Sequence, residues 1–143
     1  DVRAAHKMFY IEQAAHENPW SLVLLKGCFS PNHLVLGAYR ENSLIGYLIA
    51  QIVADEVTLL NLCVDPKFQR QGCGRLLVNN FLLAVEKESL SQCFLEVRQS
   101  NYRALQLYNR LGFKEIGLRK NYYAGLKLDQ REHAILMAYP LAG

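Results

Sequence analysis

The sequence predicts an α+β fold in which a mixed, mostly antiparallel sheet with one parallel joint is flanked by helices. Three consecutive apolar, β-rich segments with short polar turns between them are typical of an antiparallel meander. A strand, a helix and another strand follow over residues 57–97, which implies a parallel pair joined by a right-handed crossover. Another helix and two strand-like segments complete the order α-α-β-β-β-α-β-α-β-β.

Length and composition favour one ordinary globular domain over residues 1–143. Hydrophobic residues make up 51% of the chain and charged residues 20%, which is typical of a globular protein and not of a disordered one. The net charge of +3 suits an anionic cofactor but is too small and scattered to predict direct nucleic-acid binding. The chain has no run of about 18 apolar residues, so we expect no membrane span.

The cysteines and histidines give no sign of a disulfide or a metal site. The cysteines lie far apart without a C-x-x-C pair, and the histidines show no metal-ligand spacing. Reduced structural thiols are typical of cytoplasmic proteins. We therefore expect a cytoplasmic protein without a bound metal. The cysteines are Cys28, Cys63, Cys73 and Cys93.

Two helices are expected at the start of the chain. Apolar residues at helical spacing predict a helix over residues 3–16, which ends before Pro19 because the residue preceding proline avoids helical angles. Ser21 is a good N-cap for a short second helix over residues 22–28. Trp20 stands between the helices, where it could serve as a core or hinge aromatic.

The remaining elements follow from apolar periodicity and turn residues. Apolar residues on one face predict helices over residues 73–87 and 101–111, and Gly112 ends the second as its C-cap. Residues 119–131 are expected to be irregular and polar. Strands are expected at residues 34–39, 44–53, 57–64, 92–97, 113–118 and 132–139, with turns at residues 40–43 and 55–56.

A glycine-containing turn joins the strand that ends at Val64 to the helix that starts at Cys73. Glycine lets the backbone approach a ligand, and the first amides of a helix lack partners and lie at the positive end of its dipole. A phosphate satisfies both conditions, and Arg70 and Arg75 add positive charge. The alternative is a plain strand-to-helix turn in which the glycines serve geometry only.

The residues of this turn select among phosphate-binding motifs. Arg75 follows Gly74 where a P-loop has lysine, and Leu77 stands where the dinucleotide fingerprint has its third glycine. The pattern Gln-x-x-Gly-x-Gly over residues 69–74, just after Val64-Asp65-Pro66, resembles the acyl-CoA loop of the GNAT N-acetyltransferases. The resemblance covers nearly the whole chain, and the element order above is the one expected of the GNAT fold.

The resemblance implies acetyl-CoA as co-substrate and no metal. In GNAT enzymes, backbone groups at the end of the central strand pair with the pantetheine arm, and an amide there polarises the thioester carbonyl in the manner of an oxyanion hole. Loop amides bind the pyrophosphate, and an asparagine that also caps the next helix binds the pantetheine. The matching residues are Leu62, Cys63, Val64, Arg70, Gln71, Gly72, Cys73, Gly74, Arg75 and Asn101.

Other stretches resemble the RimI branch of the GNAT family, whose members acetylate the N-terminal alanine of a small-subunit ribosomal protein. They are Ile11–Ser21, Leu95–Arg98 with Asn101 and Tyr108, Arg119–Tyr123 and Arg131–Ala134. The resemblance implies a protein N-terminus as the partner, with a ribosomal protein suspected.

On the acceptor side, the resemblance places Trp20 in the wall of the peptide groove. It also places Tyr122 and Tyr123 along the slot for the acceptor N-terminus. The alternative for the two tyrosines is a pair of rings packed within a solvated loop. His133 departs from the RimI pattern, which commonly has an acidic residue there, and this leaves the acceptor preference open.

Glu96 is the candidate general base. It shares a strand face with Phe94, opposite Leu95 and Val97, so it could simply be a carboxylate on the wet face of a sheet. By resemblance to RimI-type enzymes it is the proton acceptor. An α-amino group has a pKa of about 8 and lysine one of about 10.4, so a carboxylate acting through water suits an N-terminal acceptor better.

Tyr108 is the candidate general acid. It shares an apolar helix face with Ala104, Leu105 and Leu111, so a core tyrosine is the alternative. By resemblance its hydroxyl reaches the CoA sulfur, where hydrogen bonding to the thiolate can suffice without full proton transfer. A covalent mechanism through a cysteine needs a thiolate activated by a base or a helix dipole. Cys73 lies near an expected helix start, but the resemblance disfavours this mechanism because the family motif tolerates many residues at that position.

The sequence therefore predicts a RimI-like enzyme that moves acetyl directly from acetyl-CoA to a protein N-terminus. One rival is a GNAT enzyme that acts on a lysine side chain or a small amine, whose site should tolerate loss of the aromatic residues. The other is a CoA-binding module without catalysis, which would bind the cofactor without turnover. The presence of both Glu96 and Tyr108 argues against the second rival.

Overall fold

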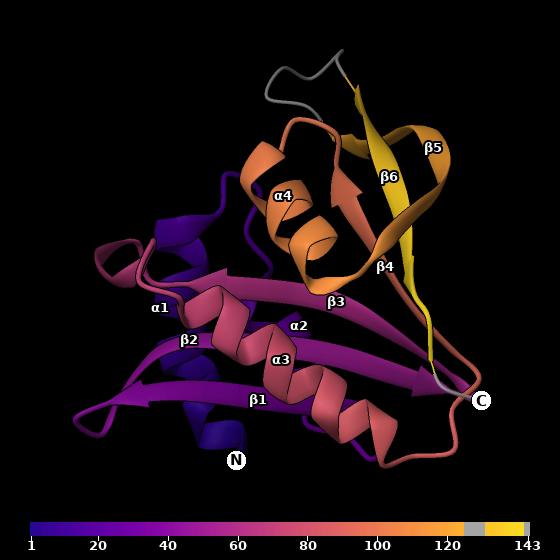
Figure 1. Ribbon diagram of the computed structural model, residues 1–143. Helices are drawn as coiled ribbons and strands as arrows, with labels where there is room; N and C mark the ends of the chain where they lie inside the picture. Colours follow the sequence, from indigo (N-terminus) through magenta and orange to yellow (C-terminus); the bar gives the residue numbers. More distant parts are fainter. Residues whose placement is uncertain (125–130, 142–143) are drawn as a thin grey trace.

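The computed structural model of the protein describes residues 1–124 and 131–141. A 3-10 turn at Val2–Ala4 precedes the first helix, and a second at Pro66–Phe68 follows the third strand. The elements, seen in Figure 1, are α1 (Ala5–Ala15), α2 (Leu22–Gly27), β1 (His33–Arg40), β2 (Ser43–Val53), β3 (Glu56–Val64), α3 (Cys73–Glu86), β4 (Gln92–Arg98), α4 (Tyr102–Leu111), β5 (Lys114–Ala124) and β6 (Arg131–Tyr139).

The described strands form a six-stranded sheet in the order β1-β2-β3-β4-β6-β5. The predicted meander β1-β2-β3 is antiparallel, and β3 pairs with β4 in parallel, as the crossover predicted. This parallel pairing stops at Leu59 and Leu95, although β3 continues to Val64 and β4 to Arg98. The far ends of the two strands are therefore not paired with each other, and the candidate site lies at this opening.

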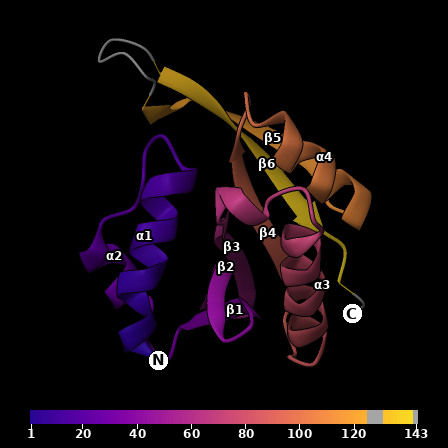
Figure 2. The same cartoon turned by 90° about the vertical axis from the view of Figure 1, so that its left-hand side faces the viewer.

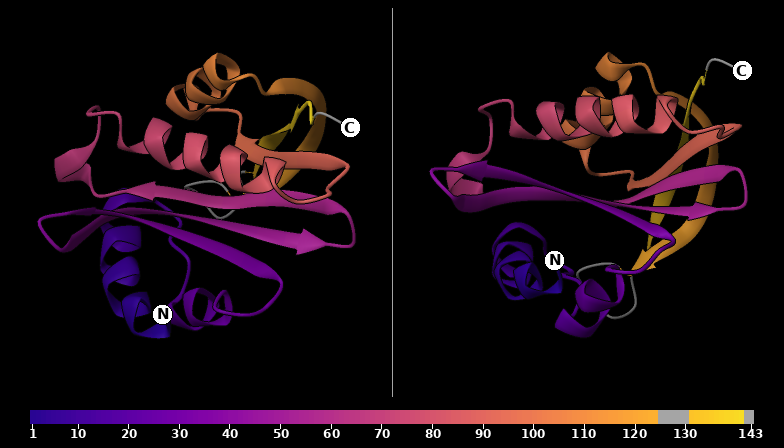
Figure 3. Two further views of the ribbon diagram at one scale, coloured as in Figure 1. Left: turned by 60° about the horizontal axis from the view of Figure 1, so that its bottom comes forward. Right: turned by 90° about the horizontal axis from the view of Figure 1, so that it is seen from below.

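Helices cover both faces of the sheet. Figure 2 shows α1 and α2 on one side of the strands and α3 and α4 on the other, and Figure 3 shows the same layers from below. Because both faces are covered, neighbouring residues of β2 are buried on opposite sides. Tyr47 and Ile49 belong to the α1 side, whereas Leu48 and Ala50 belong to the α3 side.

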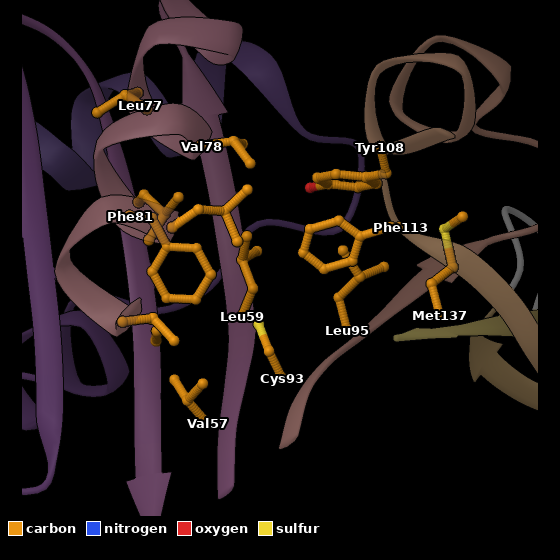
Figure 4. Close-up of a cluster of buried hydrophobic side chains, with 14 of the residues drawn as sticks. Val57, Leu59, Leu77, Val78, Phe81, Cys93, Leu95, Tyr108, Phe113 and Met137 are labelled. Carbon is orange, nitrogen blue, oxygen red and sulfur yellow. The ribbon is translucent and has the colours of Figure 1, made fainter. Parts of the chain in front are cut away.

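The larger core lies between the sheet and helices α3 and α4. Phe81 from α3 and Phe113 before β5 are at most 1% exposed, and Figure 4 shows them among side chains from β3, β4 and β6. Burying one such side chain contributes about 1.5–3 kcal/mol to stability. This cluster therefore fixes α4 and the strand ends that carry the candidate catalytic residues.

The predicted helix ends are confirmed by their caps. The Ser21 hydroxyl accepts a hydrogen bond from the Leu24 amide at 3.1 Å, and the Asn101 side-chain oxygen accepts from the Ala104 amide at 3.2 Å. Gly112 ends α4 with φ 107°, a backbone conformation that favours glycine. Helix α1 ends at Ala15, before Pro19 as predicted.

The structure corrects the expected irregular segment at residues 119–131. Strand β5 continues to Ala124, and β6 starts at Arg131; residues 125–130 lie outside the described part of the chain. The pairing of β5 with β6 shifts register between Arg119 and Tyr123, and Asn121 has φ 52°. This bulge breaks the alternation by which a strand is recognised in a sequence, so the segment reads as a loop.

The cysteines are free and buried, as predicted, and they all lie within the described residues. No helix in the described part of the chain is long and apolar enough to cross a membrane.

Candidate active site

The loop between β3 and α3 has the geometry of an anion site. Gly72 is the N-cap of α3 with φ 86°, and no side chain caps the first amides of this helix. A Cβ added at Gly72 would meet no atom within 4 Å, so the backbone is open on this side. The Gln69 side chain donates to the Val64 carbonyl at 3.0 Å and fixes the start of the loop.

A pocket of about 540 Å³ lies over this helix terminus. It is lined by the end of β3, the loop, the start of α3, one side of α4 from Arg103 to Arg110, and Ala15 and His16 at the end of α1. Eight of the predicted cofactor residues line it, namely Leu62, Val64, Arg70, Gly72, Cys73, Gly74, Arg75 and Asn101.

Two predicted cofactor residues are absent from this lining. Cys63 is 1% exposed and belongs to the core beneath α1, on the other side of the sheet from α3. Gln71 is exposed and accepts a hydrogen bond from Arg40 at 3.3 Å. Any role of Cys63 in binding CoA would therefore come from its backbone groups.

A second pocket of about 550 Å³ occupies the opening between β3 and β4. Glu96, Tyr108, Trp20 and Tyr123 all line it, so the structure brings the predicted catalytic pair together with two of the predicted acceptor residues. The two pockets share lining residues and therefore adjoin. The shared residues are Ala15, His16, Leu62, Asn101 and Ala104.

The Glu96 carboxylate faces the second pocket from β4. Leu95 and Val97 are buried on the opposite face, as predicted. The Glu96 side chain is 24% exposed, and the Arg119 guanidinium of β5 lies 3.1 Å from it. Glu96 is thus a partly solvated carboxylate that lines this pocket, and its role as a base stays a prediction.

Tyr108 is a core residue that also reaches the pocket. It is 5% exposed and packs edge-on against Phe113, with ring centroids 5.6 Å apart (Figure 4). It nevertheless lines the second pocket. Burial, with a smaller contribution from Tyr123, raises the pKa of the Tyr108 hydroxyl above its ordinary value, so this hydroxyl stays protonated at neutral pH.

The two acceptor-side tyrosines occupy different positions within β5. Their rings contact each other with centroids 5.0 Å apart. Tyr123 lines the second pocket beneath the guanidinium of Arg98, whereas Tyr122 is 42% exposed beneath Arg119 and is absent from the lining. Burial, helped by the Glu96 charge, raises the pKa of Tyr123 to about 12.

His133, the departure from the RimI pattern, supports the bulge of β5. Its Nδ1 accepts a hydrogen bond from the Asn121 amide at 2.9 Å. The neighbouring Glu132 accepts from the Ser100 amide at 2.6 Å and lies 3.3 Å from Arg98. The contacts of Glu132 hold the β4–α4 connection, which carries Asn101, against β6.

Comparison with known proteins identifies the family. The model of the acetyltransferase (GNAT) family matches residues 1–113. This chain belongs to the GNAT family. The fold and enzyme class predicted from the sequence, an N-acetyltransferase, are thereby confirmed.

Individual relatives confirm the RimI-like branch of the GNAT family. The [ribosomal protein bS18]-alanine N-acetyltransferase of Escherichia coli K12 is 40% identical over 134 residues, 94% of this chain and 89% of that protein. The Haemophilus ducreyi protein with the same name is 41% identical over 133 residues, 93% of this chain and 91% of that one. The crystal structure of the ribosomal-protein-S18-alanine N-acetyltransferase from Escherichia coli has a TM-score of 0.92 at 38% identity and covers 100% of this chain and 92% of that one.

Several residues of this GNAT site were not predicted. Arg103 and Arg110 of α4 line the first pocket, and their seven-residue spacing on one helix face was a signal that the sequence offered. His16 lies where the two pockets join, and Asn61 lines the second. Both contact Glu12, a fully buried carboxylate whose partners come both from the residues that follow α1 and from distant strands.

Proposed function

We propose that this GNAT chain transfers an acetyl group from acetyl-CoA to the N-terminal α-amino group of a protein. The acceptor that we propose is an N-terminal alanine of a ribosomal protein of the bS18 kind, which the names of the relatives state as their substrate. Two adjoining pockets, the second of which is lined by Glu96 and Tyr108, carry the proposal, because a donor in one and an amine in the other would come into contact where the pockets meet.

The residues of the first pocket fit acetyl-CoA, which would supply an activated acetyl thioester. The uncapped amides of α3 and the open backbone at Gly72 suit a pyrophosphate. Arg70, Arg75 and, from α4, Arg103 line the same pocket and add positive charge. Leu62 and Val64 would present backbone groups to the pantetheine arm at the end of β3.

Glu96 is proposed as the general base. Its partly exposed carboxylate faces the acceptor pocket and can take a proton from the amine directly or through one water. The guanidinium of Arg119, 3.1 Å away, orients the carboxylate.

Tyr108 is proposed to stabilise the leaving thiolate. Its raised pKa makes complete proton transfer to a thiolate, whose conjugate acid has a pKa of about 8.5, unfavourable. A hydrogen bond donated by the phenol lowers the energy of the developing negative charge without that transfer.

A protein N-terminus suits the second pocket better than a small amine does. Trp20 and Tyr123 come from opposite sides of the opening, and the pocket of about 550 Å³ has room for more than a single amine. An acceptor of this kind also implies work in the cytoplasm, where ribosomal proteins are made, without direct contact to nucleic acid. Residues 1–143 would serve as one catalytic domain.

The test is acetyl transfer at neutral pH to a panel of acceptors. The panel contains hexapeptides beginning with alanine, the same peptides N-blocked but carrying lysine, and small amines. Thiol release measures turnover, and mass spectrometry locates the acetyl group. We expect acetylation of the free N-terminus alone. Turnover of only lysine or small amines would overturn the acceptor assignment, and acetyl-CoA binding without turnover would favour the non-catalytic rival.

A further inference from the structure

Glu12 of α1 is a buried carboxylate that the proposed mechanism does not use. It is 0% exposed and lines neither of the two pockets. An unpaired carboxylate in such a place would be strongly destabilising, so its partners show what holds it there.

The two oxygens of Glu12 face different parts of the molecule. Oε1 accepts hydrogen bonds from the Tyr47 hydroxyl of β2 and from Asn61 Nδ2 of β3, the latter at 2.8 Å. Oε2 accepts from His16 Nδ1 at 2.7 Å and from the Trp20 amide at 3.1 Å. One oxygen therefore holds the sheet, and the other holds the connection between α1 and α2.

The connection held by Oε2 forms a wall of the second pocket. His16, Glu17, Asn18 and Trp20 all line that pocket. Glu12 Oε2 accepts hydrogen bonds from His16 and from Trp20, the first and the last of these residues. A single oxygen therefore holds both ends of this loop. On the sheet side, Asn61 lines the same pocket, whereas Tyr47 is fully buried and does not.

We propose that Glu12 is a positioning residue for the acceptor: its carboxylate fixes the 16–20 loop to Asn61 of β3, which lines the same pocket, and so sets the width of the pocket that the amine enters. This inference rests on the proposed function for the reaction itself. Fixing such a wall matters because a misplacement of about 1 Å in a substrate-binding group can cost about a hundredfold in rate.

A metal site is the other use to which this cluster could be put. Ligand atoms of Glu12, His16 and Cys63 lie within 4.8 Å of one another. The Glu12 carboxylate, however, already accepts four hydrogen bonds, and a carboxylate offers about four lone-pair sites. An ion bound to this carboxylate would have to displace at least one of these hydrogen-bond donors. The hydrogen-bonded role is therefore favoured.

The test replaces Glu12 by Met, which has a similar length and accepts no hydrogen bond from the loop or the sheet. We expect the KM for an alanine-starting hexapeptide to rise about tenfold or more, while the KM for acetyl-CoA stays within about twofold. Trp20 is the only tryptophan in the chain, so its emission reports the loop directly. In Glu12→Met without substrates, we expect emission at longer wavelength and stronger quenching by acrylamide.

Two variants separate positioning from general stability. Tyr47→Phe removes one donor on the sheet side and leaves both contacts of Oε2, so it should lower the Tm without changing the peptide KM by more than about twofold. Glu12→Gln should restore much of the peptide KM. Its amide oxygen can accept from the loop, and its amide nitrogen can donate to Tyr47 Oη and to a reoriented Asn61.

Equal effects of Glu12→Met and Tyr47→Phe on peptide KM and on Trp20 quenching would overturn the proposal and reduce Glu12 to a stabilising residue. If the unmodified protein acetylates none of the peptides, the proposed function has failed, and the quenching comparison alone then decides whether Glu12 anchors the loop.

Discussion

At the scale of single residues, the proposed function depends on side chains that are packed against the core and also reach a pocket. Glu96 lies on a strand whose neighbouring residues are buried, yet its own carboxylate reaches a pocket and contacts Arg119. Tyr108 contributes its ring to the core and its hydroxyl to the same pocket. For both residues the structural reading does not exclude the proposed catalytic one, because a residue at the edge of a core can also line a pocket.

Glu96→Gln tests the general base. We expect kcat/KM for an alanine peptide to fall about a hundredfold, with the largest loss at low pH, because an α-amine with a pKa of about 8 is then least neutral. Steady-state rates between pH 6.5 and 8.5 measure the effect, with the exposed Glu115→Gln of β5 as control. A variant that matches the unmodified protein at every pH would leave bulk water or another group as the base.

Tyr108→Phe tests the stabilisation of the thiolate. The ring contact with Phe113 remains, so we expect the Tm to change little, while kcat falls about tenfold or more and the Kd for acetyl-CoA changes far less. Tyr139→Phe is the matched control, because its ring also packs on Phe113 but lies outside the two pockets of the candidate site. Equal losses in both variants would show that packing, and not the hydroxyl, is responsible.

The role of Glu12 could not be predicted from the sequence, because its hydrogen-bond partners lie far from it along the chain. Glu12 and His16 have the spacing of neighbours on a helix, but nothing local indicates that this carboxylate is buried. Its partners Tyr47 and Asn61 lie 35 and 49 positions away. Arg103 and Arg110 were missed for a different reason, because the family motif directs attention to the loop and not to the facing helix α4.

At the scale of elements, the β3–α3 connection explains why the loop motif was informative. A strand that stops at Val64, a left-handed Gly72 and an uncapped helix start are each readable from the residues. The meander and the parallel crossover were also predicted correctly, because their periodicity is uninterrupted. The end of β5 was predicted wrongly because the bulge between Arg119 and Tyr123 places polar residues where alternation would be expected.

Gly72→Val tests the loop assignment. Valine is strained at φ 86°, and its side chain would project beside the uncapped amides of α3, so we expect the Kd for acetyl-CoA to rise about tenfold or more. Gly27→Ala is the control, because an added Cβ there also meets no atom within 4 Å and no positive φ is involved. Unchanged affinity, measured by calorimetry, would contradict the loop assignment.

At the scale of the whole molecule, the sheet separates two cores with different tasks. The core beneath α3 and α4 holds the candidate cofactor pocket and Tyr108, whereas the core beneath α1 and α2 holds the loop with Trp20. The two sides meet where β3 and β4 stop pairing, and this is where the pockets adjoin. Activity in this account therefore requires both layers at once.

The Glu12–His16 pair makes the stability of the fold depend on pH. Burial alone would lower the pKa of His16, but hydrogen bonds to Cys63 and Glu12 raise it to about 10 from 6.5. Because the pKa of His16 is higher in the folded state, the protonated His16 side chain contributes its full stabilisation below about pH 6.5. This contribution is lost as the pH rises through about 10. We expect urea unfolding to show a steeper loss of stability between pH 7 and 10 in the unmodified protein than in His16→Gln.

Parallel pH dependence in the two proteins would contradict this assignment, since the buried thiols of Cys28, Cys73 and Cys93, whose pKa values are raised by burial, titrate in both.

Simultaneous occupation of the two pockets is the central claim, and one titration tests it most directly. The probe is a conjugate in which the CoA sulfur is joined through an acetyl link to the α-amino group of an alanine-starting hexapeptide. Calorimetry compares it with CoA, with the free peptide, and with a conjugate joined through a lysine side chain. We expect the α-linked conjugate to bind at least about tenfold more tightly than CoA and than the lysine-linked form. An affinity no better than that of CoA alone would show that the second pocket does not hold the acceptor.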